Sequence, residues 1–308
     1  YRRQRQMCIR DSYTVMKDGS SVCSGMVSDV SNDDIVRLMV GRELQNRFNA
    51  MKENVSNLAH ETVFEVRNVT SRDRKKVRDI SFSVCRGEIL GFAGLVGSGR
   101  TELMNCLFGV DKRAGGEIRL NGKDISPRSP LDAVKKGMAY ITESRRDNGF
   151  FPNFSIAQNM AISRSLKDGG YKGAMGLFHE VDEQRTAEAQ RELLALKCHS
   201  VNQNITELSG GNQQKVLISK WLCCRPEVII FDEPTRGIDV GAKAEIYKVM
   251  RQLADDGKAI LMVSSELPEI ITVCDRIAVF CEGRLTQILT NRDDMSEEEI
   301  MAWALPQE

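Results

Sequence analysis

The sequence predicts an α/β fold with a mainly parallel sheet at its centre, and three features support this prediction. Short apolar runs alternate with longer stretches of helical periodicity, the arrangement expected of parallel strands joined by crossover helices. A glycine-rich loop, residues 94–101, follows the first run, and two adjacent carboxylates, Asp232 and Glu233, end the third. The five runs cover about 88–93, 137–141, 227–231, 258–263 and 276–280.

Composition narrows the classes of function. The 308 residues are 41% apolar, which allows one or two domains with a sizeable core. Lys plus Arg and Asp plus Glu both number 43, so net charge gives no reason to expect a nucleic-acid partner. No apolar run approaches the roughly 20 residues that span a bilayer, so we expect any membrane role to come through a partner. The nine cysteines lack metal-ligand spacing and are typical of reduced cytosolic thiols.

A weak internal repeat marks the N-terminal part of the chain. Residues 11–19 resemble residues 275–283, and each copy is followed by a second strand-like run and a capped, acidic helix start. The second copy closes a complete domain, whereas the first has no domain in front of it. We therefore predict that residues 13–45 are the C-terminal remnant of an earlier domain of the same type.

Two segments flank this remnant. Residues 1–12 carry four arginines and match neither copy, which indicates a sequence artefact or a disordered tail. Residues 46–62 are polar and are predicted to form a linker. The second, intact domain then covers residues 63–308.

The glycine loop has the strand–loop–helix context of a phosphate-binding loop. A buried strand at 88–93 precedes it, and a helix over 100–108, ended by Gly109, follows. Glycines let main-chain N–H groups turn around phosphate oxygens, and the helix N-terminus adds positive potential. A tight packing turn is the competing interpretation. The expected nucleotide contacts are Gly94, Gly97, Ser98, Gly99, Arg100, Thr101 and Glu102, with the Thr101 hydroxyl also on Mg²⁺.

Arg100 occupies the position at which such loops carry lysine. Lysine acts there as a compact point charge on the phosphates, whereas arginine is larger, planar and forked, so the exchange is not conservative. We predict that nucleotide binding is retained and that hydrolysis at this site is weak or absent.

The strand before Pro234 supplies acidic chemistry. Asp232 is expected to bind the hydrated Mg²⁺, and Glu233 to polarise the attacking water as the catalytic base. A solvated acidic strand end is the alternative interpretation.

Residues 208–214 read LSGGNQQ, a stretch referred to here as the signature. Ser209 is expected to cap a helix over 212–224, with Gly210 and Gly211 leaving its start open to a γ-phosphate presented by another domain. Gln213 is a further expected nucleotide contact. An ordinary capped helix is the competing interpretation.

Together these motifs resemble the ATP-binding cassette ATPases of transporters, which are P-loop NTPases, over residues 63–308. Within that family the chain is similar to the second cassette of bacterial monosaccharide importers of the ribose, xylose, galactose and allose type, the allose type most of all. The stretches that carry this resemblance are GLVGSGRTE (94–102), LSGGNQQK (208–215), FDEPTRGIDVGAK (231–243) and VSSELPE (263–269).

The resemblance implies a sugar-import ATPase that uses ATP and Mg²⁺. Its implied partners are membrane permease subunits, a first cassette and, indirectly, a periplasmic sugar-binding protein, with no nucleic acid. The implied location is peripheral, at the cytoplasmic face of the bacterial inner membrane.

The chain departs from the family pattern at four places. Besides Arg100, Glu143 stands where a glutamine normally senses Mg²⁺, and Ser265 stands where a catalytic histidine contacts the γ-phosphate. No aromatic residue lies between Val69 and Val77, where one normally stacks on adenine. We therefore predict a degenerate ATP site in this domain, with Glu143 as a metal contact and Ser265 in the catalytic position.

The signature, by contrast, is intact. In the family it completes the ATP site of the partner cassette, which implies that Ser209, Gly210 and Gly211 serve the first cassette. Residues 143–208 resemble the helical subdomain that docks a permease. Phe150, Phe151 and Phe154 are expected either on its surface or inside it. The segment before Gly87 and a hairpin at 282–283 are expected to add an antiparallel β layer.

Two functions fit these observations: the energy-coupling subunit of a sugar importer, and a non-hydrolysing nucleotide-binding and dimerisation module. A cassette protein of DNA repair or translation fits poorly. Residues 143–208 lack the sustained heptads of repair proteins, and residues 46–62 lack a basic linker.

Overall fold

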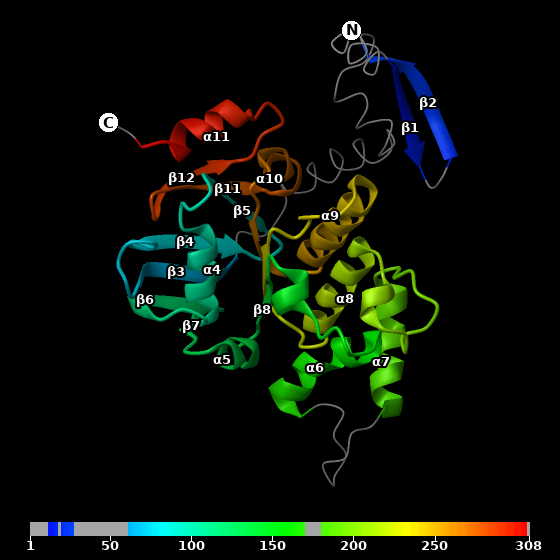
Figure 1. The fold of residues 1–308 in the computed structure, drawn as a ribbon. Helices are drawn as coiled ribbons and strands as arrows, with labels where there is room; N and C mark the ends of the chain where they lie inside the picture. The colour runs from blue at the N-terminus through cyan, green and yellow to red at the C-terminus, as the bar shows by residue number, and fades with distance from the viewer. Residues whose placement is uncertain (1–11, 18–19, 28–60, 170–179, 307–308) are drawn as a thin grey trace.

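The computed structural model describes residues 12–17, 20–27, 61–169 and 180–306 (Figure 1). Its central sheet has six strands in the order β12-β11-β5-β10-β9-β8. Five of them are parallel and match the predicted strands to within one residue at each end: β5 (Ile89–Gly94), β8 (Met138–Ile141), β9 (Val228–Asp232), β10 (Ala259–Val263) and β11 (Arg276–Cys281). Every residue of β9 and β10 is buried, which explains why these strands read as continuous apolar runs.

A second, antiparallel sheet has the order β4-β3-β6-β7, and it confirms the β layer expected before Gly87. Because β3 begins at Thr62, that residue belongs to the sheet and not to the predicted linker, whose residues 46–60 lie outside the described chain. The strands are β3 (Thr62–Ser71), β4 (Ile80–Cys85), β6 (Arg113–Leu120) and β7 (Lys123–Asp124).

The hairpin at 282–283 forms as predicted, but the expectation that it adds to the antiparallel layer was wrong. Strand β12 (Arg284–Thr290) pairs antiparallel with β11 and becomes the edge of the central sheet. The reason is that β11 is already hydrogen-bonded to β5 on one side, so its returning strand can pair only on the other. Positive φ angles of 45° at Glu282 and 77° at Gly283 suit the tight turn between them.

An aromatic ladder joins the two sheets. Phe64 and Phe82 of the antiparallel sheet continue into Phe92 and Phe280 of the central sheet, with successive ring centroids 6.4, 5.3 and 5.9 Å apart. Helix α4 (Arg100–Phe108) adds Leu103 and Leu107 to the same core. Edge-to-face and tilted ring pairs stabilise such a core beyond simple burial, so the glycine loop stands on a rigid base.

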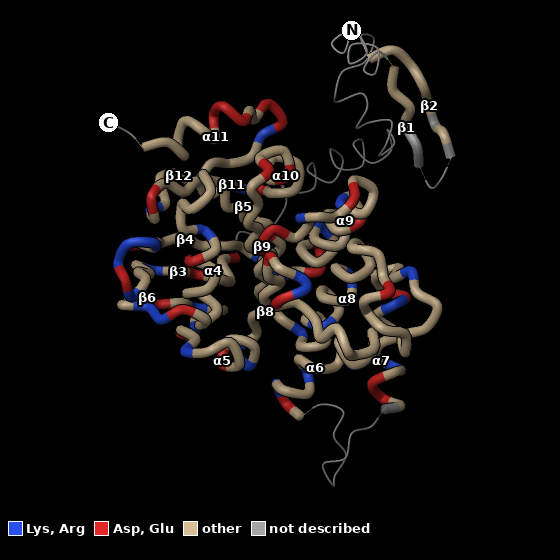
Figure 2. Tube along the Cα trace, viewed as in Figure 1, with Lys and Arg blue, Asp and Glu red and all other residues tan. Residues whose placement is uncertain are grey.

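The opposite face of the central sheet packs against three helices that contribute to a second core: α9 (Val240–Asp255), α10 (Leu267–Val273) and α11 (Glu297–Ala304). Ser296 caps α11 by accepting a hydrogen bond from the main-chain N–H of Glu299 at 3.2 Å, which confirms the capped acidic start. Figure 2 shows these acidic residues together on α11, while both signs of charge are interspersed along the rest of the described chain.

The segment between β8 and β9 is helical and has an apolar core of its own (lower right in Figure 1). Phe150 is buried in that core, so it is not the surface residue that a partner groove requires. Phe151 is 49% exposed and stacks on Phe154 at 5.1 Å. The helices are η4 (Arg145–Gly149, a π-helix), α6 (Ile156–Asp168), α7 (Glu180–Leu193), η5 (Ile205–Glu207, a 3₁₀ turn) and α8 (Gly210–Leu222). The short α5 (Pro130–Lys135) precedes β8.

Near the N-terminus, β1 (Ser12–Lys17) and β2 (Ser20–Met26) form a two-stranded antiparallel hairpin, in agreement with the strand-like runs of the first repeat copy. The capped start near residue 31 and the first eleven residues lie outside the described chain. Across the described ranges, no helix combines the length and apolarity needed to cross a bilayer.

Candidate functional site

The glycine loop joins β5 to α4, and its backbone conformation requires glycine. Gly94 and Gly99 have φ angles of 149° and 106°, and a Cβ on Gly99 would lie 2.1 Å from the main-chain oxygen of Lys76. Gly97 also has a positive φ, 82°, but a Cβ there would meet nothing within 4 Å. The loop is therefore held tightly at both ends and is open in the middle, where main-chain N–H groups can face a ligand.

Helix α4 begins at Arg100 and is closed by Gly109 in a left-handed conformation, as predicted. The Arg100 side chain is only 7% exposed and turns inward. One of its guanidinium nitrogens, Nη1, donates to the Ser264 carbonyl at 2.6 Å and approaches the Phe92 carbonyl at 3.5 Å. Burial lowers the pKa of Arg100, while the carboxylates of Glu233 and Asp232 oppose that shift. The arginine fork is thus tied to the end of β10.

Ser98 is the one loop residue with a free buried hydroxyl. Its side chain is 6% exposed, and its Oγ has no hydrogen-bond partner within the described part of the chain. A buried hydroxyl without a partner is uncommon and suits an acceptor from a ligand, such as a phosphate oxygen.

Asp232 lies at the end of β9, 1% exposed, and accepts two hydrogen bonds. The Thr101 hydroxyl donates at 3.2 Å and the Tyr140 hydroxyl at 2.9 Å. Burial raises the pKa of Asp232, and these two hydrogen bonds counteract the rise. A carboxylate beside a hydroxyl is the hard-oxygen ligand set that Mg²⁺ prefers alongside nucleotide phosphates, so the residues fit this ion.

Glu233 follows in a left-handed conformation, with φ of 49°. Its main-chain N–H donates to the Val263 carbonyl at 2.9 Å, and the Ser265 hydroxyl donates to its Oε2 at 3.2 Å. Such strained backbone in a non-glycine residue is concentrated at functional sites. Burial raises the pKa of Glu233, which favours a carboxylate able to accept a proton. The structure therefore brings together the two residues predicted for catalysis.

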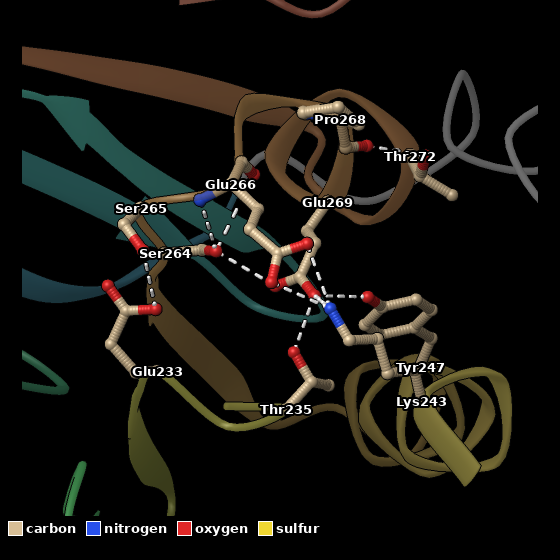
Figure 3. A network of polar contacts seen from close by, with 10 residues as sticks. All are labelled: Glu233, Thr235, Lys243, Tyr247, Ser264, Ser265, Glu266, Pro268, Glu269 and Thr272. Atoms are coloured by element: carbon tan, nitrogen blue, oxygen red, sulfur yellow. Dashed lines mark hydrogen bonds and ion pairs between the residues drawn. The ribbon is translucent and has the colours of Figure 1, made fainter. Parts of the chain in front are cut away.

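Behind this pair lies a network that the sequence did not reveal (Figure 3). Its centre is Glu269 of α10, only 5% exposed. One of its oxygens, Oε1, accepts from Thr235 at 2.5 Å, Lys243 at 2.8 Å and Tyr247 at 2.7 Å. The other, Oε2, accepts from the Ser264 hydroxyl at 2.8 Å.

Burial raises the pKa of the Glu269 carboxyl, but these hydrogen bonds outweigh burial and hold the pKa below its usual value. Through Ser264, the network fixes the strand end that supports both Arg100 and Ser265.

Two predicted contacts are engaged by neighbours. Glu143 is exposed and forms an ion pair with Arg236, so its carboxylate is not paired with the Thr101–Asp232 group. Glu102 forms an ion pair with Lys76 at 2.8 Å, which links α4 to the loop between β3 and β4. A pocket of about 420 Å³ lies beside this pair, and its lining includes Arg72 and Asp111 but no aromatic side chain.

The signature helix differs from its prediction at two points. Helix α8 begins at Gly210, two residues earlier than expected, and ends at Leu222. Ser209 occupies the N-cap position without capping, because its exposed hydroxyl accepts from the Asn212 side chain at 2.9 Å. Gly211 packs against α9, where a Cβ would lie 2.5 Å from that of Ala242. Gly211 is thus needed for close packing as well as for an open helix start.

Gln213 was predicted to contact nucleotide, and its position does not fit that role. It is 6% exposed, and its side-chain amide donates to the Leu208 carbonyl at 3.1 Å and the Ile205 carbonyl at 3.4 Å. The amide supports the loop before α8 because a side chain at this point of the helix faces the core of the helical segment.

The described residues contain no group of three or more acidic, His or Cys side chains that could hold a metal ion.

Comparisons with known proteins agree with this geometry. A model of the ABC transporter family matches residues 77–236. The D-allose import ATP-binding protein AlsA of Escherichia coli is 97% identical over 304 residues, which cover 99% of this chain and 59% of that protein. The ribose import ATP-binding protein RbsA of Bacillus cereus is 42% identical over 306 residues, with the same coverage. The chain thus spans about 59% of the length of these relatives.

A solved structure of a nucleotide-free ATP-binding cassette from an ABC transporter superposes with a TM-score of 0.67 at 21% identity, covering 80% of this chain and all of that one. At this identity the likeness shows the fold. Because the family model covers more than half of the chain and contains both the glycine loop and the Asp232–Glu233 pair, the chain belongs to the ATP-binding cassette family of transporter ATPases.

Proposed function

We propose that this chain is the ATP-binding part of a carbohydrate importer, its second nucleotide-binding domain, which couples ATP binding and hydrolysis to monosaccharide uptake. The observation that carries the proposal is the 97% identity to a protein named for D-allose import. The 42% identical relative is named for ribose import, so a monosaccharide is common to both names.

In this proposal the glycine loop cradles the phosphates of ATP through its main-chain N–H groups and the Ser98 hydroxyl. Thr101 and Asp232 hold Mg²⁺, which neutralises phosphate charge when bound. Glu233 occupies the position of the base that orients and deprotonates the attacking water, and Ser265 orients the Glu233 carboxylate through their 3.2 Å hydrogen bond.

We further propose that this site is degenerate and that the signature serves a first cassette. The inward hydrogen bond of Arg100 to Ser264 and the ion pair of Glu143 with Arg236 support the first part, because both side chains are already engaged. The exposed Ser209 hydroxyl at the open start of α8 supports the second part.

The domain plan belongs to the same proposal. Residues 13–45 are the remnant of the first cassette, residues 46–61 the linker, and residues 62–308 the second cassette. Permease subunits contact the helical segment 143–208, and a periplasmic sugar-binding protein acts through them. The chain then works peripherally at the cytoplasmic face of the inner membrane.

The alternative is a non-hydrolysing nucleotide-binding and dimerisation module. The inward Arg100 fork favours it, because a guanidinium held by a main-chain carbonyl is less free to follow a transferring phosphoryl group. ATP binding without turnover, even beside a competent first cassette, is its expected signature.

Uptake of labelled sugar by vesicles tests the import proposal. The vesicles contain the permease, the sugar-binding protein, a separately made first cassette and this chain. ATP-dependent uptake of D-allose that disappears when this chain is omitted supports the proposal. Unchanged uptake without the chain contradicts it.

A further inference from the structure

Three backbone segments, distant in sequence, meet at the side chain of Arg145. Arg145 is the first residue of η4, two positions after Glu143. Its Nη1 donates to the carbonyl of Gly210 at 2.7 Å, and its Nη2 donates to the carbonyl of Gly237 at 3.1 Å. Gly210 opens the signature helix α8, and Gly237 lies in the turn between β9 and α9. One guanidinium therefore joins the segment after β8, the signature and the turn after the catalytic strand.

Both acceptor residues are glycines, for different reasons. A Cβ on Gly210 would lie 3.0 Å from Nη1 of Arg145, which is tighter than an ordinary contact, whereas one on Gly237 would lie at an ordinary 3.5 Å from Nη2. At Gly237 the reason is the positive φ of 66°. Both acceptors are main-chain oxygens, so these two hydrogen bonds do not depend on the acceptor residues' side chains. They fix the spacing of the backbone segments directly.

Two further contacts join the same segments. Arg236, beside Gly237, forms the ion pair with Glu143, so the segment after β8 and the turn after β9 are joined a second time. At the other end of η4, the Lys220 ammonium of α8 donates to the Gly149 carbonyl. The π-helix is therefore attached to α8 at both of its ends, and a shift of this segment must carry α8 with it.

We propose that Arg145 is a positioning residue that holds the signature, the segment after β8 and the turn after β9 as one unit. Arginine is required because a lysine ammonium, a single point charge on a flexible stem, cannot bridge two carbonyls with a planar fork. The effect on another cassette's ATP site rests on the proposed function above. The attachment of the three segments to one another through Arg145, here called the joint, does not.

Hydrogen exchange of main-chain amides in the 308-residue chain tests the joint. The variants are Arg145→Lys and, as the matched control, Arg146→Lys, the same exchange at the exposed neighbouring position. We expect Arg145→Lys to speed exchange about tenfold in residues 209–216 and in 236–241, because charge-assisted hydrogen bonds at both places are lost. Residues 62–85, in the remote antiparallel sheet, should exchange as in the wild type. Unchanged exchange in either junction segment, or equal effects in the two variants, overturns the proposal.

Gly210→Ala tests the same joint without changing Arg145, and it remains informative if Arg145→Lys does not fold. Its added methyl crowds Nη1, so exchange in the turn at 236–241 should rise although the substitution lies in α8. No change in that turn contradicts the joint.

A measurement of ATP turnover distinguishes a failure of the joint from a failure of the proposed function. In mixtures with a first cassette, Arg145→Lys should lower kcat about tenfold and leave the Kd of this chain for ATP unchanged. Absence of turnover in the wild-type mixture refutes the proposed function, while the exchange results still decide the role of Arg145.

Discussion

The phosphate-loop region and the signature region differ in what their polar side chains do. Around the phosphate loop, Arg100, Glu102 and Glu143 are engaged by Ser264, Lys76 and Arg236. In the signature, the scaffolding is carried by Gln213 and Arg145, which leaves the Ser209 hydroxyl exposed. The same domain therefore contains a site whose charged side chains are held by internal contacts and a surface on which the Ser209 hydroxyl is exposed.

The largest expected effect is at the signature. Ser209→Arg should lower ATP turnover in a mixture with a first cassette at least about 100-fold, because a guanidinium would block the open start of α8, which we propose faces the partner's phosphate. Nucleotide binding by this chain alone should not change. Glu207→Arg, at an exposed position two residues earlier, is the control and should be nearly silent. Equal turnover in the two variants would contradict the proposal that the signature serves the ATP site of a first cassette.

The next effect concerns the support of the catalytic carboxylate. Glu269→Ala leaves the Lys243 ammonium and three hydroxyls without their central acceptor, and should lower the free energy of unfolding by about 3–5 kcal/mol. Glu266→Ala is the matched control: its side chain is 55% exposed, so breaking its pair with Lys243 should cost only about 0.2–1 kcal/mol. Urea denaturation measures both, and similar losses would show that the Glu269 network is not central.

A third test uses pH. Burial lowers the pKa of Lys220 from 10.5 to about 8, so below pH 8 the folded chain bears the cost of a buried charge. Between pH 8 and 10.5 the folded state loses this proton while the unfolded state keeps it, and stability rises with pH. Relative to Lys220→Met, the wild type should gain up to about 3 kcal/mol across this window.

Urea denaturation of the wild type and of Lys220→Met, at pH 8 and at pH 10.5, measures this gain in the free energy of unfolding. Parallel curves for wild type and Lys220→Met would refute the buried-charge account of Lys220.

The smallest effect is expected at the start of α6. Ser155 accepts from the main-chain N–H of Gln158 at 3.1 Å, and the Gln158 side chain accepts from that of Ser155 at 2.9 Å. Ser155→Ala should cost about 1 kcal/mol, whereas Ser155→Asp, which can still cap, should cost much less. Thermal denaturation distinguishes the two, and equal losses would mean that the capping box contributes nothing.

Local signals allowed much of the fold to be predicted. Continuous apolar runs revealed the buried parallel strands, and Arg100 with Gly109 marked both ends of α4, because strand burial and helix termination depend on neighbouring residues. The hairpin after β11 was also visible, but its sheet was not, since that depends on which edge of β11 is free.

The site was predictable only in part, for the same reason. Thr101, Asp232, Glu233 and Ser265 meet as expected because each stands at the end of a parallel strand or beside one. The bonds that define their state join residues far apart in sequence, such as Arg100 with Ser264 and Arg145 with Gly237. No periodicity reports such pairs. Tyr140 stands as a polar residue within an apolar strand, and this was the local sign that its hydroxyl needs a partner, which proves to be Asp232.

Steady-state ATP hydrolysis by this chain, alone and mixed with a separately made first cassette, tests the central claim most directly. We predict little turnover by the chain alone and clear turnover on mixing, which persists when this chain carries Glu233→Gln. Turnover by the chain alone that Glu233→Gln abolishes would contradict the account, because Arg100, Glu143 and Ser265 would then form a working site.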